Sequence, residues 1–210
     1  MTRLKGDRMR GLYLVTPNWD DTQELLKMTE LALRGGAALV QYRHKTAGLT
    51  LRREQAESLL ELCHRYERPF IVNDHVDLCI AVGADGVHVG GTDTSVAQAR
   101  TALGPDKIVG ASCYGHLQLA RDAQKAGASY VAFGGFYPSR VKKYPVTTPI
   151  DIIAQAKAEI PLPSVVVGGM THANAAPLVA AGADMVAAIS SIYMAVDSEA
   201  AAQKFSLLYR

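Results

Sequence analysis

One short sequence pattern recurs four times along this 210-residue chain. It consists of Gly-Ala, two variable residues and an apolar residue, and its copies begin at Gly36, Gly83, Gly127 and Gly182. The copies are 47, 44 and 55 residues apart, about the length of two strand–helix units. Glycine can end a helix with a positive φ, and the small alanine allows a close turn into the next strand. A repeat with this period indicates an architecture built from paired strand–helix units.

Apolar runs alternate with helical patterns along the sequence and predict eight strands, each followed by a helix. Several strands are nearly continuous in Val, Ile and Ala, as expected where both faces of a parallel sheet are buried. The predicted strands are residues 11–17, 38–45, 69–74, 86–90, 107–114, 129–135, 163–169 and 184–190. The predicted helices are residues 20–34, 50–67, 76–82, 94–103, 117–126, 149–159, 173–181 and 199–208.

These units predict an α/β fold, a single (β/α)8 TIM barrel over residues 1–210, with the repeat before every second strand. The alternative is an open, doubly wound sheet, which requires a Gly-rich phosphate-binding turn after the first strand. The sequence at that position is TPNWD, which contains no such turn. We find no linker, low-complexity segment or second domain.

Composition restricts the class of protein. A formal net charge of +2 gives no support for a nucleic-acid-binding protein. The sequence contains no run of about eighteen apolar residues, so we expect no membrane span. The charged N-terminus MTRLKGDRMR is unlike a signal peptide. The three cysteines form no Cys-x-x-Cys or zinc pattern, which favours reduced thiols in a cytoplasmic protein.

The active site of a (β/α)8 barrel lies at the C-terminal ends of its strands. The residues that end or follow each predicted strand are therefore the candidates for chemistry, and most of them are polar, charged or glycine. They are Gln41, Arg43, Lys45, Asn73, Asp74, Asp93, Ser112, Ser139, Arg140, Lys142, Gly169 and Ser190.

Two carboxylates of this set, Asp74 and Asp93, follow neighbouring strands, so a barrel would aim both at one place. Such oxygen ligands suit Mg²⁺, completed by water and phosphate. Cations on the same rim would suit a metal-bound pyrophosphate. The alternative is that Asp74 caps the next helix, Asp93 lies in a turn and the cations are solvated surface residues. The four cations are Arg43, Lys45, Arg140 and Lys142.

A second phosphate site is predicted after the last two strands, at Gly168-Gly169 and at Ile189–Ser191. Backbone N–H groups in this position, beside a helix N-terminus, form a frequent phosphate cradle in such barrels. A tight turn is the alternative for the two glycines alone. The histidines show no zinc spacing and no catalytic pairing. We interpret His88 as a hydrogen-bonded core residue and Cys113 as a small core residue.

Six motifs, in order along most of the chain, resemble the thiamine-phosphate synthase family. They are QYRHK at 41–45, IVNDHVDLCIAVGADGVHVGGTD at 71–93, GAS at 110–112, GGFYPSRVKK at 134–143, VVGGM at 166–170 and VAAISSI at 186–192. The resemblance implies a transferase that condenses 4-amino-2-methyl-5-hydroxymethylpyrimidine diphosphate with 4-methyl-5-(2-phosphoethyl)thiazole. The products would be thiamine phosphate and pyrophosphate. The sequence does not determine the oligomeric state, and a homodimer is one candidate assembly.

The resemblance also implies roles for the rim residues. One Mg²⁺ per subunit would be held by Asp74 and Asp93. Catalysis would be electrostatic, with Arg43, Ser112 and Lys142 acting by charge and position and no covalent nucleophile. The implied contacts to the pyrimidine diphosphate are Gln41, Arg43, Lys45, Asn73, Ser112 and Lys142. The implied contacts to the thiazole phosphate are Ser139, Arg140, Val141, Gly169, Ile189 and Ser190.

The chain departs from the family after the sixth strand. The family usually has Gly-Pro and Thr-x-Thr-Lys there, whereas this chain has Gly134-Gly135 and Ser139-Arg140-Val141-Lys142. One hydroxyl is therefore missing from the implied thiazole phosphate site, or Arg140 replaces it with a charge. A related branch isomerises the thiazole phosphate and needs neither Mg²⁺ nor pyrophosphate. Two further alternatives are an isomerase or aldolase with Lys142 as a Schiff-base former, and a phosphate-ligand binding protein without activity.

Overall fold

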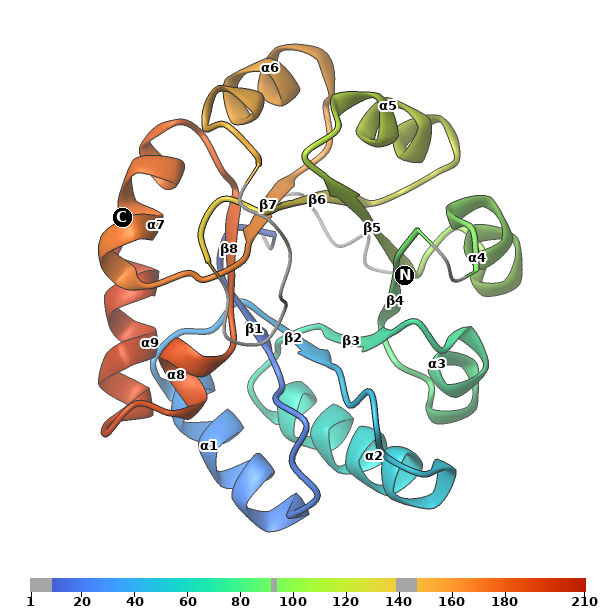
Figure 1. The fold of residues 1–210 in the computed structure, drawn as a ribbon. Helices are drawn as coiled ribbons and strands as arrows, with labels where there is room; N and C mark the ends of the chain where they lie inside the picture. The colour runs from blue at the N-terminus through green and yellow to red at the C-terminus, as the bar shows by residue number, and fades with distance from the viewer. Residues whose placement is uncertain (1–8, 92–93, 139–146) are drawn as a thin grey trace.

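The structure, a computed structural model, describes residues 9–91, 94–138 and 147–210. Within these ranges its strands are β1 (Gly11–Val15), β2 (Leu39–Tyr42), β3 (Phe70–Asn73), β4 (Gly86–Val89), β5 (Ile108–Tyr114), β6 (Tyr130–Gly134), β7 (Ser164–Val167) and β8 (Met185–Ala188). All pair in parallel, in chain order, and β8 pairs with β1 to close the sheet (Figure 1). The closed sheet confirms the (β/α)8 barrel and rules out the open, doubly wound alternative.

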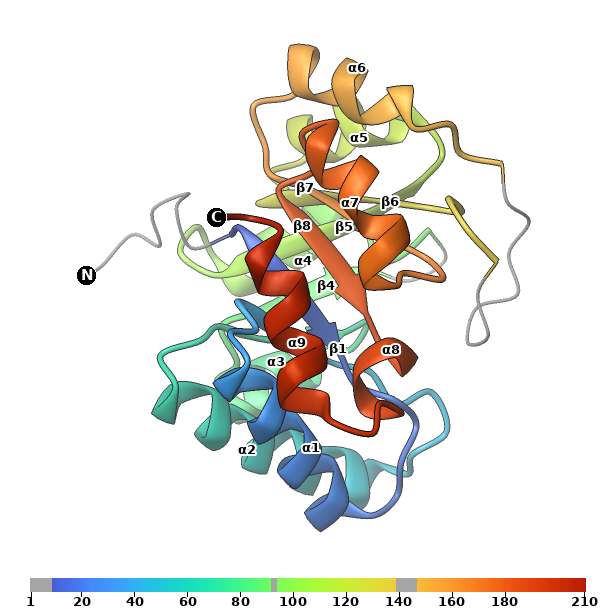
Figure 2. The same ribbon diagram turned by 90° about the vertical axis from the view of Figure 1, so that its left-hand side faces the viewer.

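Helices surround the barrel on its outer side (Figures 1 and 2). The helices of the described ranges are α1 (Thr22–Arg34), α2 (Leu49–Arg65), α3 (Val76–Val82), α4 (Val96–Leu103), α5 (Leu117–Lys125), α6 (Asp151–Glu159), α7 (His172–Ala180), α8 (Ser190–Tyr193) and α9 (Ser198–Leu207). Side-chain caps define several starts, since Asp21, Ser95 and Thr171 accept from the first turns of α1, α4 and α7. None of these helices is long and apolar enough to cross a membrane.

The four glycines of the repeat explain how each unit is joined to the next. Gly36, Gly83, Gly127 and Gly182 all have positive φ, between +74° and +107°, and each follows the end of a helix. The alanine after each glycine is buried. The repeat is thus a helix-to-strand turn that only glycine makes without strain.

The predicted elements are largely confirmed, and the main differences lie at the strand ends. β2 stops at Tyr42, three residues earlier than predicted, and β1, β7 and β8 each stop two residues early. Gly168 and Gly169 both have positive φ, so the chain turns out of the sheet there. The single turn α8 was not predicted, and it begins directly after β8, so Ser190 starts a helix instead of ending a strand. Four residues are too few to show a helical period.

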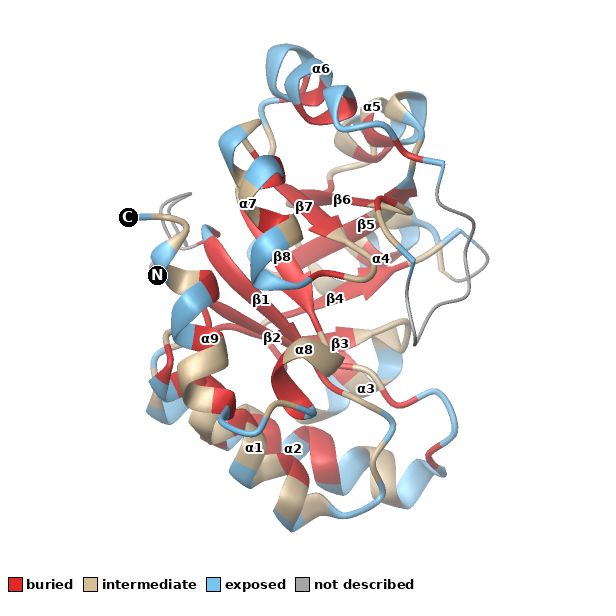
Figure 3. Ribbon diagram, turned by 60° about the vertical axis from the view of Figure 1, so that its left-hand side comes forward, coloured by how far each residue is buried: buried red, intermediate tan, exposed pale blue. Residues whose placement is uncertain are grey.

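Two apolar cores hold the barrel together. One lies between the sheet and the helices, and the other fills the barrel interior with residues such as Leu39, Ile71 and Met185. The strands are therefore buried on both faces (Figure 3). Tyr130 crosses the interior beside Gly110, where a Cβ would come within 2.0 Å of the tyrosine ring. Glycine at this position makes room for the ring.

One arginine ties together the loops at the face where the strands begin. The guanidinium of Arg100, on α4, donates to the carbonyl oxygens of Gly104 and Lys107 at 2.7 and 2.6 Å. It also donates to the carbonyl oxygen of Gly127 and to Ser129 Oγ, each at 3.0 Å. These four partners precede β5 and β6, so one side chain fixes the segments that lead into both strands.

Replacing Arg100 with lysine should lower the free energy of unfolding by about 2 kcal/mol, because a single ammonium group cannot contact all four partners at once and leaves shielded carbonyls unpaired. Urea denaturation at neutral pH measures this loss. The matched control is Arg53→Lys, since Arg53 forms an exposed ion pair with Glu57 on α2. Similar urea concentrations at the unfolding midpoint for the two variants would contradict the structural role of Arg100.

Candidate active site

Asp74 directly follows β3 and its carboxylate is held by two neighbours. Lys45 Nζ forms an ion pair with Asp74 Oδ2, and Asn73 Nδ2 donates to the same oxygen. The Asp74 backbone N–H donates to the carbonyl oxygen of His88 at 2.8 Å, and its φ is +64°. The side chain is 12% exposed. A non-glycine residue held in the left-handed region at a strand end is typical of a functional site.

The helix-cap interpretation of Asp74 is wrong. His75 occupies the N-cap position of α3, and no side chain caps this helix. The Asp74 carboxylate instead contacts residues from the ends of β2 and β3, which places it on the rim. Asp93, the predicted second carboxylate, lies outside the described residues.

The described ranges contain no group of three or more His, Cys, Asp and Glu side chains that could hold a metal ion. A magnesium site of the predicted kind needs fewer protein ligands, because water and phosphate supply the remainder. Asp74 fits such a site, since its carboxylate is a hard oxygen donor that is mostly shielded from bulk solvent.

The segment after β2 is fixed by two side chains outside the candidate set, Thr16 and His44. Thr16 Oγ1 accepts from the Arg43 backbone N–H at 2.8 Å. The buried His44 contacts Asp20 Oδ1 through Nε2 at 2.9 Å, and its Nδ1 accepts from the Ala47 N–H at 3.0 Å. His44 is thus a structural residue that holds this segment. Lys45 remains beside Asp74, although β2 ends before it.

Ser112, on β5, contacts the interior of the barrel. Its Oγ lies 2.9 Å from His88 Nε2, and His88 Nδ1 lies 2.9 Å from the hydroxyl of Tyr130. Gln41, on β2, is buried and donates through Nε2 to the hydroxyl of Tyr13 at 2.7 Å. The interpretation of His88 as a hydrogen-bonded core residue is confirmed. The two tyrosines were missed, because each lies in an apolar strand without any distinguishing pattern.

The loops after β6 and β7 lie against each other. The Pro138 carbonyl oxygen approaches Gly169 so closely that a Cβ there would come within 2.2 Å of it. Where the described chain resumes at residue 147, the backbone N–H groups of Thr147 and Thr148 donate to the Gly135 carbonyl oxygen at 3.1 and 3.2 Å. Four predicted site residues lie outside the described residues: Ser139, Arg140, Val141 and Lys142.

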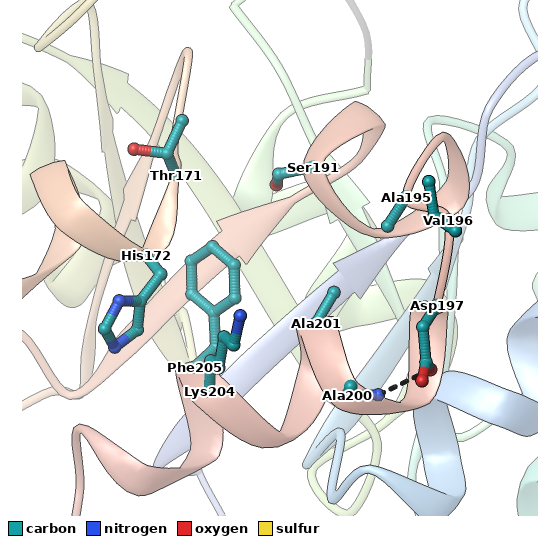
Figure 4. Close-up of a pocket in the computed structure, with 10 residues that line it drawn as sticks. All are labelled: Thr171, His172, Ser191, Ala195, Val196, Asp197, Ala200, Ala201, Lys204 and Phe205. Atoms are coloured by element: carbon teal, nitrogen blue, oxygen red, sulfur yellow. Dashed lines mark hydrogen bonds between the residues drawn. The ribbon is translucent and has the colours of Figure 1, made fainter.

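Ser190 and Ser191 begin α8, but they differ in their surroundings. Ser191 Oγ is shielded from solvent, finds no hydrogen-bond partner in the described part of the chain and lines a pocket of about 420 Å³ (Figure 4). This pocket lies among α7, α8 and α9 and is lined by none of the candidates on β2, β3 and β5. Ser190 and Ile189, by contrast, directly follow β8, next to the loop after β7.

A family model described as thiamine monophosphate synthase matches residues 12–192. The chain belongs to this family. It is 65% identical over 201 residues to the thiamine-phosphate synthase of Janthinobacterium sp. (strain Marseille), covering 96% of this chain and 97% of that one. It is also 47% identical to the thiamine-phosphate synthase of Methylobacillus flagellatus, with both chains covered completely.

Solved structures agree with this family. The thiamine phosphate pyrophosphorylase from Pyrococcus furiosus aligns with a TM-score of 0.84 and 29% identity over 96% of both chains. A 3-hexulose-6-phosphate synthase aligns with a TM-score of 0.71 at 19% identity, which shows a shared fold alone. Membership in the thiamine monophosphate synthase family confirms the resemblance found in the six motifs, and the chain is a transferase of this family.

Replacing Gly169 with alanine should destabilise the fold more than the same change at Gly83. Both residues have positive φ, but only Gly169 meets the carbonyl of Pro138, whereas nothing lies within 4 Å of a Cβ at Gly83. Gly169→Ala should lose about 1–3 kcal/mol more in the free energy of unfolding, because the Pro138 segment must move. Urea denaturation of both variants measures the difference, and equal losses would contradict the close approach of the two loops.

Proposed function

We propose that the chain condenses the pyrimidine diphosphate with the thiazole phosphate at the rim of its barrel, with the products thiamine phosphate and pyrophosphate. The observation that carries this proposal is the group formed by Lys45, Asp74 and Asn73. It places a shielded carboxylate next to a cation where the diphosphate contacts are implied. Family membership supports the reaction, because the relatives are named thiamine-phosphate synthases.

This reaction needs a site for the leaving group and no nucleophilic side chain. The bond between the pyrimidine methylene and the diphosphate oxygen breaks, and its electron pair leaves with pyrophosphate. The thiazole nitrogen then donates its lone pair to the resulting pyrimidine cation and forms the new C–N bond. Arg43, Lys45 and Lys142 neutralise the charge that develops on the leaving group.

Mg²⁺ is the cofactor that we propose for the diphosphate. Asp74 and Asp93 would hold the ion, with water and phosphate as the other ligands. When bound, the ion would neutralise charge on the diphosphate without any proton transfer. Asn73 and Lys45, which now hold the Asp74 carboxylate, would then turn toward the substrate.

The two substrates would occupy different parts of the rim. Gln41 and Ser112 would contact the pyrimidine diphosphate, and the loops after β6, β7 and β8 would form the thiazole phosphate site. The short helix α8 directly after β8 supports a phosphate cradle, because barrels of this class often bind phosphate beside such an extra helix. The proposed contacts are Gly169, Ile189 and Ser190, together with Ser139, Arg140 and Val141.

We place the protein in the cytoplasm. Cys63, Cys79 and Cys113 are buried and unpaired, which suits a reducing compartment. Burial raises the pKa of Cys113 to about 12, so this thiol stays protonated and takes no part in the chemistry as a thiolate.

Incubation with both phosphorylated precursors, with and without Mg²⁺, tests the reaction. Thiamine phosphate and pyrophosphate should form in equal amounts, and only with Mg²⁺. No product with Mg²⁺ would overturn the proposal. A binding protein would instead retain its ligand in EDTA without turnover. Borohydride trapping of a carbonyl substrate on Lys142 would favour the isomerase or aldolase.

Replacing Asp74 with asparagine should reduce kcat/KM by about 10³-fold, because the variant loses a charged oxygen ligand at the leaving-group site. Asparagine tolerates the left-handed backbone, so the fold should persist. Steady-state kinetics at saturating Mg²⁺ measure the loss, and calorimetry should show unchanged binding of the thiazole phosphate. The control is Asp106→Asn, an exposed carboxylate at the opposite face of the barrel, which should keep full activity.

A further inference from the structure

Five side chains form a continuous hydrogen-bonded chain through the interior of the barrel, which we call the inner relay. Gln41 Nε2 donates to the Tyr13 hydroxyl at 2.7 Å, and the hydroxyls of Tyr13 and Tyr130 lie 2.6 Å apart. The Tyr130 hydroxyl lies 2.9 Å from His88 Nδ1, and His88 Nε2 lies 2.9 Å from Ser112 Oγ. The members come from β2, β1, β6, β4 and β5, so the inner relay spans the barrel.

The middle of the inner relay is fully shielded and rigidly packed. Tyr13 and Tyr130 are 1% and 0% exposed, and their rings meet edge to face with centroids 5.8 Å apart. His88 stacks on Tyr130 with centroids 5.6 Å apart. Burial raises the pKa of both tyrosine hydroxyls far above the usual range, so each keeps one proton to donate.

The direction of the hydrogen bonds follows from counting these protons. Tyr13 accepts from the Gln41 amide, so its own proton goes to the Tyr130 oxygen, because an unused buried donor would be costly. Tyr130 then donates to His88 Nδ1. An imidazole that accepts at Nδ1 carries its proton on Nε2 and donates to Ser112 Oγ. Ser112 Oγ thus accepts a hydrogen bond from His88, and its own proton is left to point toward the rim.

We propose that the inner relay makes Ser112 a hydrogen-bond donor toward the diphosphate substrate, with Tyr13, Tyr130 and His88 as positioning residues for it. The substrate in this statement rests on the proposed function, whereas the direction of the relay rests on the side-chain geometry and on the count of donors and acceptors. The opposite direction requires the Gln41 amide to be turned over, so that Tyr13 donates to its oxygen. Ser112 would then donate to His88 and offer the substrate only an acceptor.

This direction has a chemical consequence for the proposed reaction. A hydroxyl donor at Ser112 suits an acceptor atom on the diphosphate, whose oxygens gain charge as the pyrimidine bond breaks. The donor is set before the substrate arrives, because the buried tyrosines cannot reorient freely. The relay also connects Ser112 to Gln41, another proposed contact to the pyrimidine diphosphate, so both contacts depend on one buried network.

The tautomer of His88 tests the direction directly. Long-range ¹H–¹⁵N correlation spectra of the whole, ¹⁵N-histidine-labelled protein should show His88 protonated at Nε2 and bare at Nδ1, with resonances assigned through their loss in His88→Gln. Tyr130→Phe removes the donor to Nδ1 and keeps the ring, so this variant should show a mixture of tautomers. A proton on Nδ1 in the unmodified protein would overturn the proposal. This measurement needs no substrate, so it stays informative if the proposed reaction fails.

A double-mutant cycle between Tyr130 and Ser112 tests the positioning role. Tyr130→Phe should lower kcat/KM by about tenfold, the scale expected when a group that orients a functional residue is lost. Ser112→Ala alone should lower kcat/KM more than Tyr130→Phe alone. The double variant should have the same kcat/KM as Ser112→Ala. Multiplicative losses would mean that Tyr130 acts through general stability, and they would overturn the role. Tyr13→Phe serves as the second variant, with the same expectation, if Tyr130→Phe does not fold.

Tyr42→Phe is the matched control. Tyr42 is also a buried tyrosine, 2% exposed, and its hydroxyl donates to Gln55 Oε1 at 2.9 Å on the outer side of the barrel. Its loss should lower thermal stability about as much as that of Tyr130→Phe but leave kcat/KM and the His88 tautomer unchanged. A loss of kcat/KM in Tyr42→Phe equal to that in Tyr130→Phe would also overturn the positioning role.

Discussion

The pairing of β8 with β1 is the constraint on which the other features depend. Because the parallel sheet closes, it has no free edge, and both faces of every strand are covered, one by helices and one by the barrel interior. Polar side chains of the sheet can then remain hydrated only at the two ends of the strands. At the C-terminal ends of the strands lie Asn73, Asp74 and Lys45. Arg100 holds the loops at the N-terminal ends.

The barrel interior is the exception to this segregation, and it shows what such an exception requires. Buried hydroxyls and an imidazole are tolerated because each hydroxyl and each ring nitrogen has a hydrogen-bond partner, from Tyr13 through to Ser112. An apolar core would fill the same space with fewer restrictions. The network instead gives the substrate side of the barrel a defined pattern of donors, at the cost of a core that accepts few substitutions.

In the described part of the rim, charge is arranged around the Asp74 carboxylate, whose backbone lies in the left-handed region. Asp74 is held in the left-handed region by its N–H bond to the carbonyl of His88, and its side chain is held by Lys45 and Asn73. The same His88 belongs to the inner relay, so the carboxylate and the hydroxyl of Ser112 share one support on β4. This common support links the two parts of the proposed leaving-group site through a single strand.

Local patterns in the sequence were enough to predict the barrel, the ring of candidate residues and the family, because period, repeat and motif are local properties of the chain. The glycine turns before every second strand illustrate this, since each needs only its own backbone conformation. Which residues meet depends on how the chain is folded in three dimensions. Tyr13 and Tyr130 are 117 residues apart and carry no pattern that joins them. The pairing of Asp74 with Lys45 and the single turn α8 were likewise outside local prediction, because they depend on barrel closure and on contacts between loops.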